Sequence, residues 1–259
     1  MKLNIKMKLV AAAASGLLLS SVAQGAEVKV LASGAVKEAA LELFPQFEKA
    51  SGNTVAVTWA GTVDIKKKIA DGEVFDLVIV ASPELDSFAK DGKIAAGSKV
   101  DLVKSSIGVA VKVGAAKPEF TTGDDLKKTL LAAKSVGYST GPSGAYLVTL
   151  FERMGITDQI KAKAKITTPG VPVATLIRSG EAEIGFQQVS ELIHEAGIDF
   201  LGPIPADIQN ITVFSSGVPA AAKAQTEARA LQKFLTAPAA APVIKKHGLE
   251  RIPRAPSAS

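Results

Sequence analysis

Short apolar runs alternate with amphipathic stretches along this chain, a pattern that predicts parallel β-strands connected by helices. In the first part the expected elements are strands at 27–31, 54–59 and 75–80 and helices at 34–50 and 63–71. The run Asp76-Leu77-Val78-Ile79-Val80 is apolar after its first residue, which is typical of a strand covered on both faces. Pro83 follows closely and is suited to the first turn of another helix.

The alternation starts again at the apolar run 107–113, which predicts a second α/β lobe. The elements expected after it are helices at 123–133, 144–154 and 172–178, strands at 135–138, 165–168, 182–187 and 208–218, and helices at 225–235 and 238–247. We expect one lobe to comprise residues 26–106 and 213–259 and the other residues 107–212. Two strands would cross between the lobes as hinges and leave a ligand cleft where helix N-termini converge.

The pattern of residues 1–25 predicts a signal peptide that is cleaved on export. Three lysines precede the apolar run 9–22, and the small-residue site Ala23-Gln24-Gly25 follows it. The apolar run is shorter than the roughly 20 residues that a membrane-spanning helix needs. We therefore expect a mature protein that begins at Ala26 and is located outside the cytoplasm.

The composition of the chain narrows its chemistry. It contains no cysteine, which excludes disulfides, thiolate metal sites and a cysteine nucleophile. The net charge of +5 includes the three lysines of the predicted leader, so the mature charge is closer to balance. Acidic and basic residues are interspersed, as in Asp124-Asp125-Leu126-Lys127-Lys128, and aromatic residues make up only 5% of the chain. We therefore expect no nucleic-acid partner.

Three predicted turns place a small residue and a hydroxyl just before a helix: Ala32-Ser33-Gly34, Ala60-Gly61-Thr62 and Gly141-Pro142-Ser143-Gly144. Each would present backbone N–H groups and a hydroxyl at the positive end of a helix, an arrangement that suits an anion. The segments Gly170-Val171-Pro172 and Phe186-Gln187-Gln188 should lie at the same end of the sheet. The hydroxyls would also serve as ordinary N-caps, so the turns alone leave both interpretations open.

Known phosphate-binding and catalytic motifs are missing from the chain. It has no GxxxxGK[ST] loop, no GxGxxG opening a βαβ unit, no GxSxG elbow, no HExxH helix and no EF-hand loop. The two histidines, His194 and His247, lie at positions that favour surface or helix-capping roles. Arg178 lies close to the predicted cleft and is a candidate clamp for a carboxylate, although a cation is also favoured at a helix C-terminus.

The chain resembles the molybdate-binding proteins of ABC importers in the segments ASGAVKEAALELFPQFEKASG, TWAGTVDIKKKIADGEVFDLVIVAS, YSTGPSGAYLVTLFERMG, GEAEIGFQQVSE and PAAAPVIKKHGLE. The resemblance covers nearly all of the mature chain and implies the type II periplasmic binding-protein fold, in which two α/β lobes close over a small anion. It implies a periplasmic monomer that needs no cofactor or metal and delivers its ligand to a membrane permease. The ligand-binding positions that it implies are Ser33, Gly34, Gly61, Thr62, Ser143, Gly144, Val171 and Gln188.

Three of these positions, in two segments of the chain, depart from the pattern of that family. Gly61 and Thr62 stand where the family has paired serines, and Gln188 stands where it has a tyrosine. These changes remove hydroxyls suited to a small tetrahedral dianion and add an amide that both donates and accepts hydrogen bonds. They favour a larger and flatter ligand, a di- or tricarboxylate rather than molybdate. Of the two adjacent glutamines, we expect Gln188 rather than Gln187 to face the cleft, because side chains alternate along a strand.

Periplasmic aconitate isomerase is similar to the same family, so a second function stays open. Moving the double bond between cis- and trans-aconitate requires abstraction of an allylic proton and its return at another carbon. One positioned acid–base group beside carboxylate-binding groups is enough for this reaction, and no cofactor is needed. The sequence does not identify such a base. It therefore favours a receptor that captures a small anion, with a cofactor-independent isomerase as the alternative.

Overall fold

The computed structural model describes residues 25–253, which form an α/β architecture. The chain first forms β1 (Glu27–Ser33), η1 (Gly34–Val36), α1 (Lys37–Ser51), β2 (Thr54–Ala60), α2 (Thr62–Ala70), β3 (Leu77–Ala81) and α3 (Ser82–Lys90). It continues with β4 (Val100–Lys112), α4 (Gly123–Ala132), β5 (Val136–Tyr138), α5 (Pro142–Met154), α6 (Thr157–Lys161), β6 (Ala164–Ile166), α7 (Val173–Ser179), β7 (Ile184–Gln188) and η2 (Val189–Glu191). The last elements are β8 (Ile198–Pro203), η3 (Ala206–Ile208), β9 (Ile211–Gly217), α8 (Gln225–Thr236), η4 (Pro238–Ala240), α9 (Ala241–Lys246) and β10 (Glu250–Arg251).

The signal peptide predicted for residues 1–25 lies outside the described residues apart from Gly25, and so do residues 254–259. Between residues 25 and 253, no helix combines the length and the apolar character that crossing a membrane requires.

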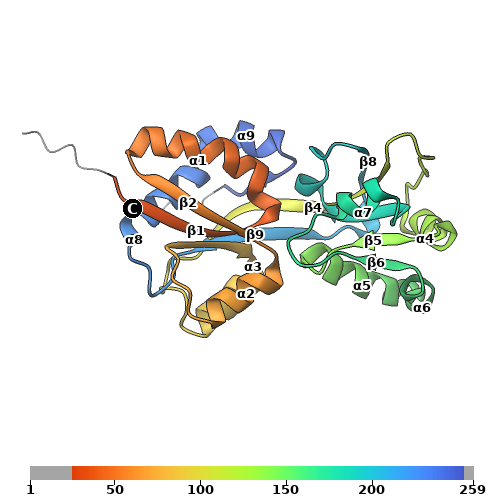
Figure 1. Cartoon of the computed structure of the whole chain (residues 1–259), viewed down its shortest axis with the longest axis horizontal. Coiled ribbons are helices and arrows are strands. Elements are labelled where there is room, and N and C mark those ends of the chain that lie inside the picture. The colour runs from red at the N-terminus through yellow and green to blue at the C-terminus, as the bar shows by residue number, and fades with distance from the viewer. Residues whose placement is uncertain (1–24, 254–259) are drawn as a thin grey trace, which may run out of the picture.

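The strands form two sheets that share β4 (Figure 1). Its first part, from Val100 to Ser106, pairs with β9, and the sheet continues through β3 and β1 to β2. Its second part, from Ile107 to Lys112, pairs with β7 and β8, and that sheet continues through β5 to β6. The chain passes between the sheets a second time at residues 209–210, which connect η3 to β9. We call the halves the first lobe, which holds the first and last described strands, β1 and β10, and the second lobe.

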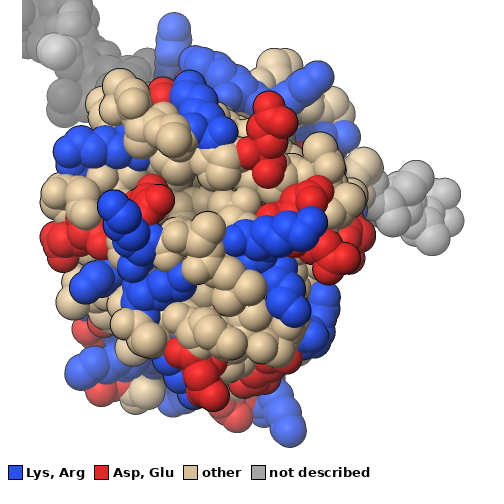
Figure 2. All heavy atoms as spheres, turned by 90° about the vertical axis from the view of Figure 1, so that its right-hand side faces the viewer, with Lys and Arg blue, Asp and Glu red and all other residues tan. Residues whose placement is uncertain are grey.

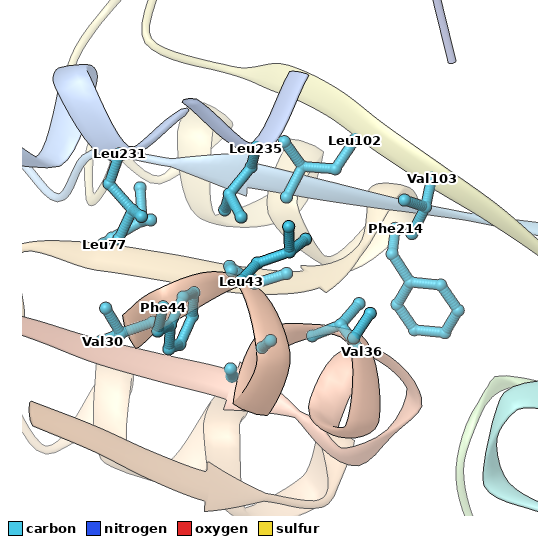
Figure 3. Close-up of a cluster of buried hydrophobic side chains, with 14 of the residues drawn as sticks. Val30, Val36, Leu43, Phe44, Leu77, Leu102, Val103, Phe214, Leu231 and Leu235 are labelled. Carbon is cyan, nitrogen blue, oxygen red and sulfur yellow. The ribbon is translucent and has the colours of Figure 1, made fainter. Parts of the chain in front are cut away.

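Each lobe buries its own apolar clusters, and helices provide one side of each. In the first lobe, α1 contributes apolar residues at three- and four-residue spacings and α8 does the same, which is the pattern of helices packed on a sheet. Figure 3 shows Leu43 and Phe44 of α1 in the same cluster as Leu231 and Leu235 of α8, against strand residues such as Leu77. A comparable cluster in the second lobe joins α4 and α5 to β4, β5 and β7.

Two strands differ from the sequence prediction for local reasons. β4 starts at Val100, well before the predicted residue 107, because Asp101 and Lys104 interrupt the apolar pattern that the prediction depended on. Asp101 is accommodated there by accepting a hydrogen bond from the Ser215 hydroxyl at 2.6 Å. β8 was not predicted at all, because it ends in Gly202-Pro203, which is normally a turn signal.

Charged side chains of both signs alternate over the end of the second lobe, as Figure 2 shows. Exposed pairs such as Asp125–Lys128, at 3.6 Å, and Asp199–Lys117, at 3.0 Å, belong to this lobe. Solvent-exposed pairs of this kind add little stability. They do keep the surface of the lobe polar without concentrating one sign of charge on the face in view.

Asp76 connects three segments of the first lobe, and its removal should be costly. The buried carboxylate accepts hydrogen bonds from the backbone N–H groups of Lys29, at 2.9 Å, and of Lys223 and Ala224, at 2.8 and 2.9 Å. We expect Asp76→Ala to lower the free energy of unfolding by about 3 kcal/mol or more, because buried donors lose their acceptor. Urea unfolding measures this loss.

The matched control is Asp71→Ala. Asp71 pairs with Lys67 on an exposed helix face, so we expect a loss below about 1 kcal/mol. Equal effects of the two substitutions would contradict the role assigned to Asp76.

Candidate functional site

A cleft of about 290 Å³ lies between the two lobes. The first lobe contributes the turn from β1 into η1 and the turn from β2 into α2. The second lobe contributes the turn from β5 into α5, the loop before α7, and the end of β7 with η2. Among the predicted ligand-binding residues, those that line the cleft are Ser33, Gly34, Gly61, Thr62, Ser143, Val171 and Gln188. The strand ends therefore bring together turns that are far apart in the sequence.

Hydroxyl groups and helix N-termini face each other across this cleft. Ser33 is buried and caps η1, accepting a hydrogen bond from the Ala35 N–H at 3.4 Å. Thr62 begins α2, and Ser143, which is only 1% exposed, lies in the first turn of α5. The first N–H groups of these helices have no partner within the helix, and the positive helix ends favour a negative ligand. This part of the site is suited to the oxygens of an anion.

Three of the predicted residues do not offer a free group to a ligand in the cleft. Gly144 does not line the cleft; a Cβ there would lie 1.6 Å from the Ser139 carbonyl oxygen, so its role is to let α5 pack closely on the preceding turn. Arg178 also lies outside the cleft lining, where its guanidinium donates to Glu195 at 2.6 Å. Val171 does line the cleft, but its N–H donates to the Thr168 carbonyl within the same turn.

Both glutamines at the end of β7 line the cleft, with different tasks. Gln187 accepts from the N–H of Val173 at 2.8 Å and donates to Glu191 at 2.9 Å, so both polar atoms of its amide have a partner. Gln188 donates from Nε2 to the Thr212 hydroxyl at 2.9 Å, whereas its buried Oε1 has no partner among the described residues. Because a hydroxyl also donates, the Gln188 amide can reverse and offer N–H to a ligand.

Glu191 is a cleft residue that the sequence analysis missed. It reaches from η2 in the second lobe toward Gly34 in the first, where an added Cβ would lie 3.1 Å from its Oε1. Burial raises the pKa of the Glu191 carboxyl to about 7, and the Glu195 charge acts in the same direction, while the hydrogen bond from Gln187 opposes it. The neighbouring Ser190 hydroxyl is buried without a partner among the described residues. Both residues lie at the end of the segment GEAEIGFQQVSE, just after the strand that this segment contains. Their position after a strand was the signal that the sequence offered.

The two histidines form a connected pair that the sequence did not indicate, while His194 is exposed, in line with the surface role expected for it. His247 does end α9, but it is buried, and its Nδ1 lies 2.9 Å from Nε2 of His194. His247 Nε2 lies 3.0 Å from Oε2 of Glu42 on α1. His194 lines the cleft, as does Lys37 at the start of α1. Within residues 25–253, no group of His, Asp and Glu side chains is arranged to hold a metal ion.

The two lobes touch beside the cleft at a pair of glycines. A Cβ on Gly61 would lie 2.7 Å from the backbone nitrogen of Gly170, a distance that real Cβ atoms do not reach. Gly170 itself has φ +79°, a conformation that favours glycine. The absence of a side chain at Gly61 is therefore what allows the lobes to approach this closely.

The sequence model of bacterial extracellular solute-binding proteins matches residues 28–250. The chain belongs to this family. It is 37% identical to an aconitate isomerase from a Pseudomonas species over 233 residues, which cover 88% of each chain. It is 27% identical over 252 residues to the molybdate-binding protein ModA of Azotobacter vinelandii, covering 93% of this chain and 96% of that protein.

The fold agrees with solved structures of the same kind. The periplasmic molybdate-binding protein of Azotobacter vinelandii superposes with a TM-score of 0.71 at 18% identity, covering 88% of this solute-binding protein and all of that chain. This likeness confirms the predicted α/β fold of a type II periplasmic binding protein.

The contact at Gly61 predicts that an added methyl group weakens ligand binding. We expect Gly61→Ala to weaken binding by about ten- to a hundredfold, because overpacking costs about 1–3 kcal/mol when the lobes close. The measurement is a thermal-shift titration with oxyanions and with di- and tricarboxylates, applied to the anion that stabilises the unsubstituted protein.

Gly141→Ala is the matched control in the same cleft. A Cβ there has ordinary space, 3.4 Å from the nearest atom, and φ is −78°. If Gly61→Ala bound the anion as tightly as Gly141→Ala, the close approach would have no part in binding.

Proposed function

We propose that this protein is a periplasmic isomerase of a small tricarboxylate of the aconitate type, and that Glu191 is its acid–base residue. The observation that carries the proposal is the placement of the Glu191 carboxyl in a cleft whose hydroxyl-bearing turns and helix N-termini suit an anion. A carboxylate there repels an anionic ligand, which is a disadvantage for a receptor. It is what a proton transfer needs, since a buried carboxyl with a pKa of about 7 both takes up and returns a proton near neutral pH. The similarity to an aconitate isomerase supports the same conclusion.

The remaining groups of the cleft suit the carboxylates of such a substrate. Ser33, Thr62 and Ser143 offer hydroxyls near helix N-termini, and Gln188 offers an amide. Lys37 adds a positive charge at the first-lobe wall. A ligand with three carboxylates and a planar double bond fills more of a 290 Å³ cleft than a tetrahedral oxyanion does.

The proposed reaction transfers one proton between two carbons of the substrate. The Glu191 carboxylate takes a proton from the methylene carbon of trans-aconitate, and the electron pair left behind is delocalised over the allylic carbons and the attached carboxylates. Protonated Glu191 then returns the proton to the carbon at the other end of the allylic unit. The double bond shifts by one position to give cis-aconitate, no atom is gained or lost, and no oxidant or cofactor takes part.

The similarity to the molybdate-binding protein supports a second candidate function. A periplasmic receptor on this fold would bind a small anion and pass it unchanged to the permease of an ABC importer. The two candidates differ in what happens to the ligand, so one incubation separates them.

We expect the protein to convert trans-aconitate into cis-aconitate in heavy water with incorporation of deuterium at the allylic carbon. Glu191→Gln should lower the rate by about 10²- to 10⁴-fold, because the amide cannot accept the proton. Proton NMR measures both product and label. Glu181→Gln, an exposed carboxylate next to Ser179, is the matched control and should keep the full rate.

Two results would contradict this proposal. Unlabelled and unchanged trans-aconitate after long incubation with folded protein would favour the receptor. A full rate in the Glu191→Gln protein would assign the proton transfer to another group.

The rate should also depend on pH through the state of Glu191. Only the carboxylate form abstracts a proton, so the rate should rise with pH through about 7 and then level off. Initial rates at saturating trans-aconitate between pH 5.5 and about 8.5 test this expectation, because they do not depend on how tightly the substrate binds. A rate that is flat across this range would mean that the ionisation of Glu191 does not control the reaction.

A further inference from the structure

The connected side chains Glu42, His247 and His194 run from the outer face of α1 to the cleft, and they restrict how the two rings hold protons. Hydrogen bonds from Lys246 and then from His247 hold the pKa of the Glu42 carboxyl below its usual value, so it is a carboxylate near neutral pH. A carboxylate only accepts hydrogen bonds, which places a hydrogen on His247 Nε2.

The contact between the two rings then holds a single hydrogen. Two N–H groups facing each other at 2.9 Å would repel, and two lone pairs would not bond. One hydrogen therefore lies between His247 Nδ1 and His194 Nε2. The remaining nitrogen of the chain is His194 Nδ1, which either carries a hydrogen or presents a lone pair. With that hydrogen the pair of rings is a cation, and without it the pair is neutral.

The arrangement is built across the junction of the lobes. His194 belongs to the second lobe, while Glu42 and His247 belong to the first. His247 is buried, and Gly248, at φ +70°, packs so closely on the second lobe that a Cβ would lie 2.8 Å from the side chain of Ile193. The close packing of Gly248 on the second lobe therefore holds the neighbouring His247 ring at the junction of the lobes.

We infer that His194 is a specificity-determining residue that binds a substrate carboxylate through a protonated ring, and that His247 and Glu42 are positioning residues that stabilise this charge. The inference deepens the proposed function and rests on it for the choice of ligand. A neutral His194 presents a lone pair that repels a carboxylate, whereas the cationic ring donates a charge-assisted hydrogen bond. Binding of a carboxylate at His194 therefore takes up a proton.

The other charged groups around the pair define the conditions of the test. In the segment after β7 that carries His194, Glu191 and Glu195 also line the cleft. Arg178 forms an ion pair with Glu195. From α1 come Lys37 and Glu38, and from α9 comes Lys246, which pairs with Glu42. Glu191 is the group that would also take up a proton when an anion binds. The experiment is therefore carried out in the Glu191→Gln protein, which also keeps the ligand unchanged.

Isothermal titration calorimetry with trans-aconitate, tricarballylate and citrate, in buffers of different ionisation enthalpy, counts the protons taken up. Above neutral pH we expect Glu191→Gln to take up close to one proton on binding and its affinity to fall as pH rises. Adding His194→Gln should remove the uptake and weaken binding about ten- to a hundredfold. Adding Glu42→Gln instead preserves an acceptor for His247 but removes the charge. It should shift the uptake to lower pH without loss of thermal stability, which a purely structural contact would not do.

Because the chain has only two histidines, imidazole NMR of the same variants follows both rings without overlap. Uptake that persists after His194→Gln, or trans-aconitate binding without uptake, would overturn the inference and leave the proposed function in place. Binding of citrate or tricarballylate with uptake, but not of trans-aconitate, would support the role of His194 and overturn the proposed substrate. Absence of binding by all three carboxylates would overturn both.

Discussion

The structure depends on one strand being shared by two sheets. The first part of β4 completes the sheet of the first lobe and the second part belongs to the sheet of the second, so the lobes cannot separate without breaking a continuous ladder. The Gln209 side chain reinforces the point of change: it accepts from the N–H of Ile107 at 2.9 Å and donates to the carbonyl of the same residue at 3.1 Å. Because both sheets end at this junction, their helix-opening turns face each other, and the cleft is a consequence of the topology.

Within that cleft, different groups attract an anionic ligand and carry the acidic side chain Glu191. Hydroxyls, an amide and helix ends attract an anion without burying a fixed positive charge. Glu191 is an acidic group in the same cleft. Burial raises the pKa of its carboxyl to about 7 and the hydrogen bond from Gln187 opposes this rise, so the carboxyl is close to half ionised at neutral pH. The oxygen of the same Gln187 amide accepts a hydrogen bond from the first N–H of α7. The N-terminus of α7 is therefore linked to the Glu191 carboxyl through the Gln187 side chain, and this N–H is not available to a ligand.

The sequence was sufficient to predict those elements and cleft residues that depend on a local pattern of residues. Apolar periodicity located β1, β2 and β3 and the helices between them, and the helix-opening turns of both lobes supplied cleft residues such as Ser33 and Ser143. It was insufficient where roles arise from distant contacts. His194 meets a partner 53 positions away in the other lobe, and nothing in either local pattern indicates this. Gly144 has the same local signature as a ligand-binding glycine, yet the backbone of the preceding turn explains it.

For the proposed isomerase, the space opposite Glu191 has an implication for how catalysis would arise on a receptor fold. The carboxyl is carried by one lobe, and the room for it is provided by Gly34 in the other, so a working site exists only while the two lobes are together. A receptor benefits when its two lobes stay closed over the bound ligand until a permease opens them. An isomerase must instead release a product nearly identical to its substrate at every cycle. On this fold, evolution from a receptor to an enzyme would require a lower affinity for the ligand as well as a base. The turnover rate would then be set by how fast the two lobes open to release the product.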